Sequence, residues 1–68
     1  MIDLTVNGKP RQIEEAQSIA ELLVFYGINP LLVAVEHNGE IVRRERFGEV
    51  MLGQEDTLEI IHAVGGGA

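Results

Sequence analysis

The sequence of 68 residues contains no cysteine and no tryptophan, and only 4% of it is aromatic. Without cysteine the chain can form no disulfide framework, thiolate zinc site, cysteine nucleophile or persulfide side chain. No apolar run approaches the ~20 residues of a membrane-spanning helix, and the N-terminus lacks the pattern of a signal peptide. We therefore expect one small domain of a reducing compartment, the cytoplasm, with a core of isoleucine, leucine and valine and no membrane partner.

Basic residues are also scarce, with five against eleven acidic ones and a formal net charge of −6. Because nucleic acids carry dense negative charge, this balance disfavours binding to them. An acidic domain is suited to association with a basic protein surface, although solubility alone would also explain the sign of the charge.

The N-terminal residues predict a β-hairpin. Apolar and polar residues alternate over 2–6, as in a half-buried strand. Asn7-Gly8 follows, and this dipeptide is typical of a two-residue turn of type I′. A second strand is expected over Lys9–Ile13, at a sheet edge because Pro10 lacks a backbone donor.

A short helix of about ten residues is expected next. Ser18 and Glu21 have the spacing of a capping box, in which each side chain binds the backbone N–H of the other. Gly27 is suited to end the helix, and Pro30 disfavours its continuation. The apolar stripe of this helix comprises Ile19, Leu22, Leu23 and Tyr26.

Two strands joined at Asn38-Gly39 are predicted to form a second hairpin. The first is expected over Leu31–Glu36, with Val33 and Val35 facing inward, and the second over Glu40–Arg43.

The last third of the chain begins without clean periodicity. We expect irregular structure over 47–52, anchored by Phe47, and then a turn over 53–56. The final strand is expected over Thr57–Ala63 with Leu58 and Ile60 inward, and residues 64–68 are read as a flexible, glycine-rich tail. The domain itself would cover residues 1–63.

The order hairpin, helix, hairpin, strand predicts an α+β fold with one helix on one face of a sheet. The final strand has no hairpin partner directly before it, so it must pair with an existing edge. An arrangement with this strand between the first and third strands, parallel to the first, resembles the ubiquitin-like β-grasp fold, a mixed sheet of four to five strands on one helix.

Strand parity predicts a second surface, on the sheet face that the helix leaves uncovered. If Val33 and Leu58 face the helix, their sequence neighbours point the other way. We expect this apolar surface to dock a partner, although scattered aliphatic residues or self-association would also explain it. Its members are Leu32, Ala34, Ile61 and Ala63.

Catalytic and metal-binding patterns are absent from the sequence. His37 and His62 lie far apart and outside any motif, so we interpret both as surface or rim residues. Ser18, the only serine, is explained as a helix cap, and Glu55-Asp56 as a solvated turn. No resident cofactor or metal is therefore expected.

A basic cluster is formed by Arg43, Arg44 and Arg46. We expect these side chains to pair with Glu40, Glu45 and Glu49, although they could also contact a partner.

The run Gly65–Gly67 follows a strand and opens no helix, so it is not a phosphate-binding loop. It could be a simple flexible tail. Alternatively, backbone without Cβ atoms could thread a channel too narrow for side chains and deliver a terminal carboxylate to another enzyme's active site. Activation by AMP would make that carboxylate a good acyl group, so even a chain without cysteine could carry sulfur as a thiocarboxylate.

Nearly the whole chain resembles the small ubiquitin-like sulfur carriers of thiamin biosynthesis. The resemblance rests on the order and spacing of four segments, Ile2–Gly8, Ser18–Leu23, Val33–Val42 and Asp56–Ile61. It implies a protein that is not an enzyme and is a monomer when free. An ATP-dependent, ubiquitin-activating-like enzyme would adenylate the C-terminal glycine, and sulfur relayed from a cysteine desulfurase would convert it to a thiocarboxylate for thiazole synthase.

The acceptor implied by this resemblance is Gly67, with Gly66 as its partner, while Val64 and Gly65 would contact the partner enzyme. The family pattern ends in glycine, whereas this sequence ends in Ala68. If Ala68 is removed or is an addition to the natural sequence, Gly67 becomes terminal. If Ala68 is retained, its methyl group would occupy the glycine channel.

Three other functions remain compatible with the residues. One is a related carrier for molybdopterin synthesis, and another is an unconjugated β-grasp interaction module whose glycines are only a tail. The last is a ubiquitin-like modifier that is joined to lysines of other proteins. The products of incubation with ATP and an adenylating enzyme would distinguish them.

Overall fold

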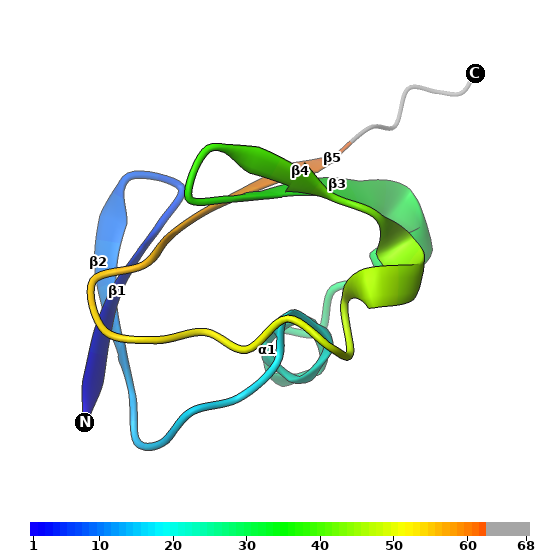
Figure 1. Cartoon of the computed structure of the whole chain (residues 1–68). Coiled ribbons are helices and arrows are strands. Elements are labelled where there is room, and N and C mark those ends of the chain that lie inside the picture. The colour runs from blue at the N-terminus through cyan, green and yellow to red at the C-terminus, as the bar shows by residue number, and fades with distance from the viewer. Residues whose placement is uncertain (63–68) are drawn as a thin grey trace.

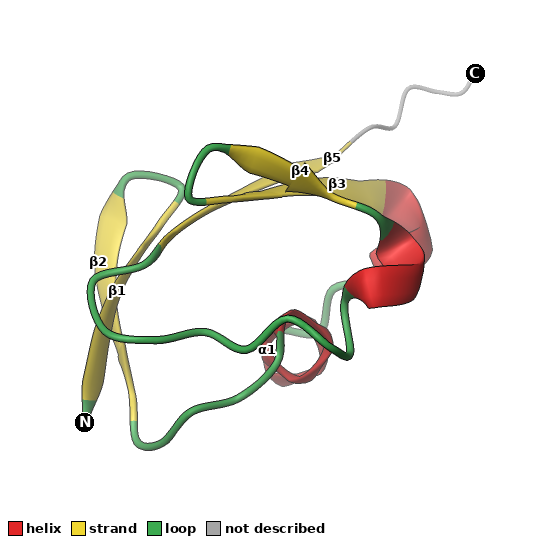
Figure 2. Ribbon diagram, in the orientation of Figure 1, coloured by secondary structure: helices red, strands yellow, loops and turns green. Residues whose placement is uncertain are grey.

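A computed structural model describes residues 1–62, so the predictions for Ala63 and for the tail over 64–68 lie outside the described residues. Figures 1 and 2 show a curved sheet with one α-helix on one side. In chain order the elements are β1 (Ile2–Val6), β2 (Lys9–Ile13), α1 (Ile19–Phe25), the 3₁₀ helix η1 (Pro30–Leu32), β3 (Val33–His37), β4 (Glu40–Val42), the 3₁₀ helix η2 (Arg44–Arg46) and β5 (Thr57–His62). No helix among residues 1–62 has the length and apolar content needed to span a membrane.

The five strands have the order β2-β1-β5-β3-β4, so β5 lies at the centre of the sheet. It pairs parallel with β1 and antiparallel with β3, which confirms the predicted place of the last strand and the mixed sheet. The prediction that β2 is an edge strand is also confirmed.

Both predicted hairpin turns are present, and both use positive φ angles. Asn7 and Gly8 have φ of 52° and 80°, and Asn38 and Gly39 have φ of 52° and 87°. These angles are those of type I′ turns, which match the right-handed twist of the strands that they connect. The two Asn-Gly dipeptides therefore determined both hairpins locally.

Helix α1 covers seven residues and ends earlier than the ten residues predicted, because Tyr26 is already its C-terminal cap. The capping box is present: the Glu21 N–H donates to Ser18 Oγ (3.1 Å), and the Ser18 N–H donates to Glu21 Oε1 (2.8 Å). Gly27 follows with φ of 72°, the left-handed conformation expected of a helix end.

The cap gives the first testable prediction. Replacing Ser18 by alanine removes the acceptor for the Glu21 N–H, and should lower the free energy of unfolding by about 1 kcal/mol. Urea unfolding followed by circular dichroism measures the difference. The Ser18→Gly variant, whose small side chain lets solvent reach the helix end, should lose less. Equal stability of Ser18→Ala and the wild-type protein would contradict the assigned cap.

The segment between η2 and β5 has little regular structure, as predicted, and it covers the beginning of α1. The Ile19 N–H donates to the Val50 carbonyl (3.1 Å) and the Ala20 N–H donates to the Phe47 carbonyl (2.9 Å). The free N–H groups of the first helical turn are thus satisfied by distant backbone. Phe47 is buried, which confirms its predicted role as an anchor.

One hydrophobic core lies between the inner face of the sheet, α1 and the irregular segment. Its buried members include the predicted inward positions of β3 and β5, together with the apolar stripe of α1 except the half-buried Tyr26. They are Leu4, Val6, Ile13, Ile19, Leu22, Leu23, Val33, Val35, Phe47, Leu52, Leu58 and Ile60.

The predicted strand over Leu31–Glu36 was wrong at its start. Leu31 and Leu32 belong to η1, and β3 begins only at Val33. The cause is local: Asn29 Oδ1 accepts the Leu31 N–H (2.9 Å), and Pro30 begins the turn with a fixed φ. The helical turn η2 was also not predicted, and it moves the end of the preceding strand to Val42.

Candidate functional site

The C-terminal end of β5 is where the predicted acceptor segment leaves the domain. Ile61 pairs with Ala34 and His62 pairs with Val33, the first residue of β3. The exit of the chain therefore lies at the end of the sheet next to η1 (Figure 2). The predicted residues Ala63, Val64, Gly65, Gly66 and Gly67 follow this point and lie outside the described residues.

The sheet face turned away from α1 carries an apolar patch beside this exit. Ala34 and Ile61 are exposed, as strand parity predicted, and Ile61 retains 52% of its accessible surface. Ile41 on β4, which was not predicted, is 75% exposed and pairs with Glu36 on the same face. We call Ala34, Ile41 and Ile61 the outer patch.

Leu32 is exposed as expected, but for a different reason. It lies in η1 rather than on β3, so the parity argument that placed it on the outer face does not apply. With 55% of its surface exposed, it adds apolar area directly before Val33, the residue opposite His62.

Two carboxylates border the outer patch. Glu36 on β3 and Glu59 on β5 are directly paired across the strands, and both alternate with the inward-facing core residues. Like charges at such a position are unfavourable in the free protein, and a cation on an opposing surface would relieve the repulsion. The patch is thus apolar at its centre and acidic beside it, in a protein of net charge −6.

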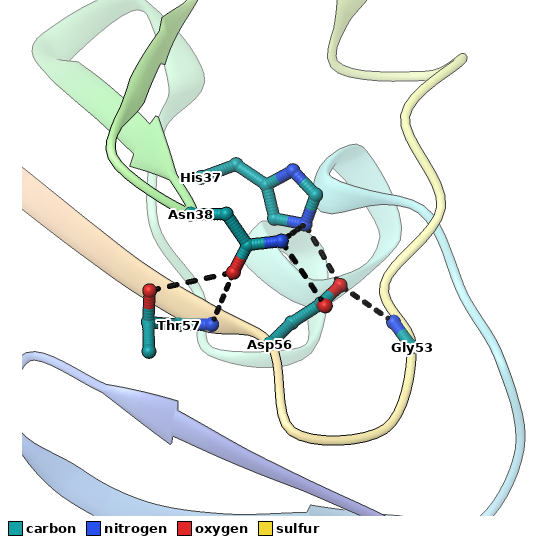
Figure 3. A network of polar contacts seen from close by, with 5 residues as sticks. All are labelled: His37, Asn38, Gly53, Asp56 and Thr57. Carbon is teal, nitrogen blue, oxygen red and sulfur yellow. Dashed lines mark hydrogen bonds and ion pairs between the residues drawn. The ribbon is translucent and has the colours of Figure 1, made fainter.

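A polar network joins the β3–β4 turn to the beginning of β5 (Figure 3). Asp56 Oδ2 lies 2.8 Å from His37 Nε2 and accepts the Gly53 N–H at 2.8 Å. Asp56 Oδ1 accepts from Asn38 Nδ2 (3.2 Å), and Asn38 Oδ1 accepts the Thr57 N–H (2.9 Å). The His37 and Asp56 side chains are each 18% exposed.

The network changes the acidity of Asp56. Burial by itself raises the pKa of this carboxyl, but hydrogen bonds from His37, the Gly53 amide and Asn38 together outweigh burial and hold the pKa below its usual value. Asp56 is therefore ionised at neutral pH. The prediction that Glu55-Asp56 is a solvated turn is wrong for Asp56, because its oxygens are occupied by protein donors.

His37 was predicted at the surface or rim, and it lies at the rim of the sheet with most of its ring covered. Its partner could have been found from the predicted topology. With β5 placed beside β3, Asp56, the residue directly before β5, lies next to the turn that contains Asn38. Ser18, whose hydroxyl is engaged at the start of α1, supplies no nucleophile to this His–Asp pair. The network can therefore stabilise a turn, but it lacks the third member of a hydrolytic triad.

The arginine cluster forms ion pairs largely as predicted. Arg46 Nε lies 2.8 Å from Glu49 Oε1, and Arg43 Nε lies 3.4 Å from Glu45 Oε2. Arg44 instead donates to the Pro30 carbonyl (3.2 Å) and so links η2 to η1. The predicted pair with Glu40 is wrong, because none of the ion pairs found within residues 1–62 includes it. These pairs are solvent-exposed and contribute little stability.

No three histidine, aspartate or glutamate side chains come together to hold a metal ion within the part of the chain that the structure describes. This part of the chain therefore presents an exposed apolar patch and a central strand that ends at His62.

A mixed sheet of five strands with a parallel central pair, wrapped on one helix and leading to a glycine run, defines a ubiquitin-like β-grasp protein. The fold class predicted from the sequence is confirmed. The same architecture occurs in a crystal structure of a ThiS thiamine biosynthesis protein from Geobacter metallireducens. That chain is 36% identical, with a TM-score of 0.85, and the match covers 97% of the present chain and all of the Geobacter chain.

The sequence model of the ThiS family matches residues 4–67. The sulfur carrier protein ThiS of Bacillus subtilis is 42% identical over 65 residues, which are 94% of this chain and 98% of the Bacillus protein. A thiazole synthase of Magnetococcus marinus is 39% identical over 62 residues, but the chain spans only 19% of its length. The chain belongs to the ThiS family, and it is a sulfur carrier of thiamin biosynthesis rather than an enzyme.

Proposed function

We propose that the chain carries sulfur as a thiocarboxylate on Gly67. The observation that supports this most directly is the match to the ThiS family, which runs to Gly67 and stops one residue before Ala68. Gly67 would have to be terminal to react, either after removal of Ala68 or because Ala68 is an addition to the natural sequence. We retain the predicted division into a β-grasp domain over 1–63 and a C-terminal segment over 64–68.

The chemistry would be supplied by partner enzymes. A carboxylate is a poor acyl group, so an adenylating enzyme would join it to AMP from ATP and release pyrophosphate. The persulfide of a relay from a cysteine desulfurase would then displace AMP to form an acyl disulfide, and a thiol would reduce the S–S bond to leave the thiocarboxylate. The carrier itself contributes a reactive end, and we place it in the cytoplasm, as a monomer when free, where ATP and reduced sulfur are available.

Glycine suits this end for a geometric reason. Backbone without Cβ atoms can enter a channel that excludes side chains, so Gly65, Gly66 and Gly67 could reach a buried active site. A fully extended chain spans at most ~3.5 Å per residue, so Gly67 could lie up to roughly 17 Å beyond His62. A partner would therefore bind the folded domain and the C-terminal segment at once.

The outer patch is the surface that we propose for this docking, together with Leu32 and with Ala63, Val64 and Gly65 at the start of the C-terminal segment. It lies beside the exit of β5, and its acidic border favours a partner with basic side chains around an apolar centre. We propose thiazole synthase as one partner of this surface. The presence of a related segment within the Magnetococcus thiazole synthase supports this pairing, because there the two would be parts of one protein.

The direct test measures intact mass. Chains ending at Gly67, at Ala68 and at Gly65 are incubated with ATP, an adenylating enzyme of the ubiquitin-activating type and a sulfur donor. We expect only the chain ending at Gly67 to gain the mass difference between sulfur and oxygen. Omission of ATP is the control. No change in any chain would indicate an interaction module, and adducts of high mass would indicate a protein modifier.

A further inference from the structure

The asparagine of the first hairpin turn binds the central strand through its side chain. The Ile60 N–H donates to Asn7 Oδ1 (2.7 Å), and Asn7 Nδ2 donates to the Ile60 carbonyl (3.3 Å). The Asn7 N–H also donates to the Leu58 carbonyl (2.8 Å). One residue thus both forms the turn with φ of 52° and binds two residues of β5.

This contact continues the β1–β5 ladder beyond the end of β1. The parallel backbone register of the two strands ends with Val6 opposite Leu58, because the chain turns away at Asn7-Gly8. The amide of Asn7 takes the place that a further strand residue would occupy, and extends the pairing by two residues to Ile60. Ile60, two residues before the end of β5, is therefore held from both sides, by Asn7 and by β3, where it is paired with Val35.

The second hairpin turn binds the other end of the same strand in a similar way. Asn38 has the same φ of 52°, its N–H donates to the Thr57 carbonyl (2.9 Å), and its Oδ1 accepts the Thr57 N–H (2.9 Å). Figure 3 shows this amide between Asp56 and Thr57. The two asparagines differ mainly in place: Asn38 binds the beginning of β5, and Asn7 binds it near the exit of the chain.

We propose that Asn7 is a positioning residue for sulfur loading. The inference rests on the proposed function of Gly67, which follows Ile60 by seven residues. With Asn7 in place, the last residues of β5 leave the domain in one direction relative to the outer patch. Without it, Ile60 is held only from the side of β3, so the end of β5 can pivot relative to the rest of the sheet. Fewer docked complexes then have the carboxylate in place for adenylation.

The test compares Asn7→Gly with Asn38→Gly in chains ending at Gly67. Glycine adopts the positive φ at both positions, so each variant keeps the geometry of its turn. Each variant loses only the side-chain amide that binds one end of β5. Steady-state adenylation is measured by pyrophosphate release, with the carrier as the varied substrate. We expect kcat to fall about threefold to tenfold for Asn7→Gly with KM within twofold, since one or two hydrogen bonds hold the strand end. We expect Asn38→Gly to keep the wild-type kcat, even though it loses more contacts.

Amide hydrogen exchange of the unaltered protein provides a measurement that does not depend on any variant. The Ile60 N–H should exchange slowly, like the N–H groups of backbone-paired strand residues, and Asn7→Gly should accelerate it while leaving Thr57 protected. Fast exchange of Ile60 in the wild-type protein would overturn the inference. Equal losses of kcat in both variants, or a wild-type kcat in Asn7→Gly, would also overturn it. Failure of the wild-type chain to be adenylated would instead reject the proposed function.

Discussion

Replacing Ile61 by aspartate should reduce kcat/KM for adenylation by about tenfold or more and leave the domain folded. Ile61 is already 52% exposed, so the substitution removes little burial from the core. On docking, however, the new carboxylate would be transferred into the apolar centre of the interface, where an unpaired charge costs several kcal/mol. It would also add to the charges of Glu59 and Glu36 on the same face.

A matched control is available on the opposite side of the molecule. Val24 on α1 is 77% exposed, so Val24→Asp introduces the same charge on an exposed apolar residue away from the outer patch. We expect this variant to be adenylated like the wild-type chain. If Ile61→Asp retains the wild-type kcat/KM, or if both variants lose it equally, the outer patch is not the docking surface.

Replacing Asp56 by asparagine should have the largest effect on stability, a loss of about 1–3 kcal/mol in the free energy of unfolding at neutral pH. The carboxylate accepts hydrogen bonds through both oxygens, from His37 and Gly53 on one and from Asn38 on the other. An asparagine amide has only one oxygen, so its NH₂ group must face at least one of these donors. Chemical denaturation at pH 7 measures the loss.

The same carboxylate gives the stability a dependence on pH. Because the pKa of Asp56 is lower in the folded protein, its contribution is complete above the ordinary aspartate pKa of 3.8 and is lost as the pH falls through the folded value. The difference in the free energy of unfolding between the wild-type protein and Asp56→Asn should therefore shrink as the pH falls below about 4. Glu55→Gln is the control, since Glu55 is exposed and accepts only from Gln54 in the network around it. Parallel stability curves of wild type and Asp56→Asn across this range would contradict the assignment.

Local signals in the sequence were sufficient where short-range chemistry decides the backbone. Both Asn-Gly dipeptides formed the expected turns, and the spacing of Ser18 and Glu21 marked the start of α1. The prediction failed at Leu31, where apolar and β-branched composition favoured a strand. There the Asn29 side chain and the fixed φ of Pro30 stabilise a 3₁₀ turn, and this local chemistry outweighed the composition.

Strand parity predicted two of the three residues of the outer patch. Because side chains alternate along a strand, the inward positions Val35 and Leu58 required Ala34 and Ile61 to lie on the outer face, and both are exposed there. The place of Ile41 in the outer patch was not predicted, because it depends on the register with which β4 pairs with β3. The network of His37 and Asp56 joins residues 19 positions apart and could not be read from either segment alone.

The sequence by itself determined the turns, the helix cap, the inward and outward alternation of the strands and the glycine-rich end, because each depends on neighbouring residues and on the geometry of the backbone. Only the tertiary structure decided which side chains bind the central strand and the turn before it. Asn7 binds Ile60, which lies 53 residues later in the sequence, and Asp56 binds His37, which lies 19 residues earlier. Both contacts form because long-range strand pairing brings their elements together. Such contacts depend on register and on the packing of the whole sheet, which residue types and spacing do not encode locally.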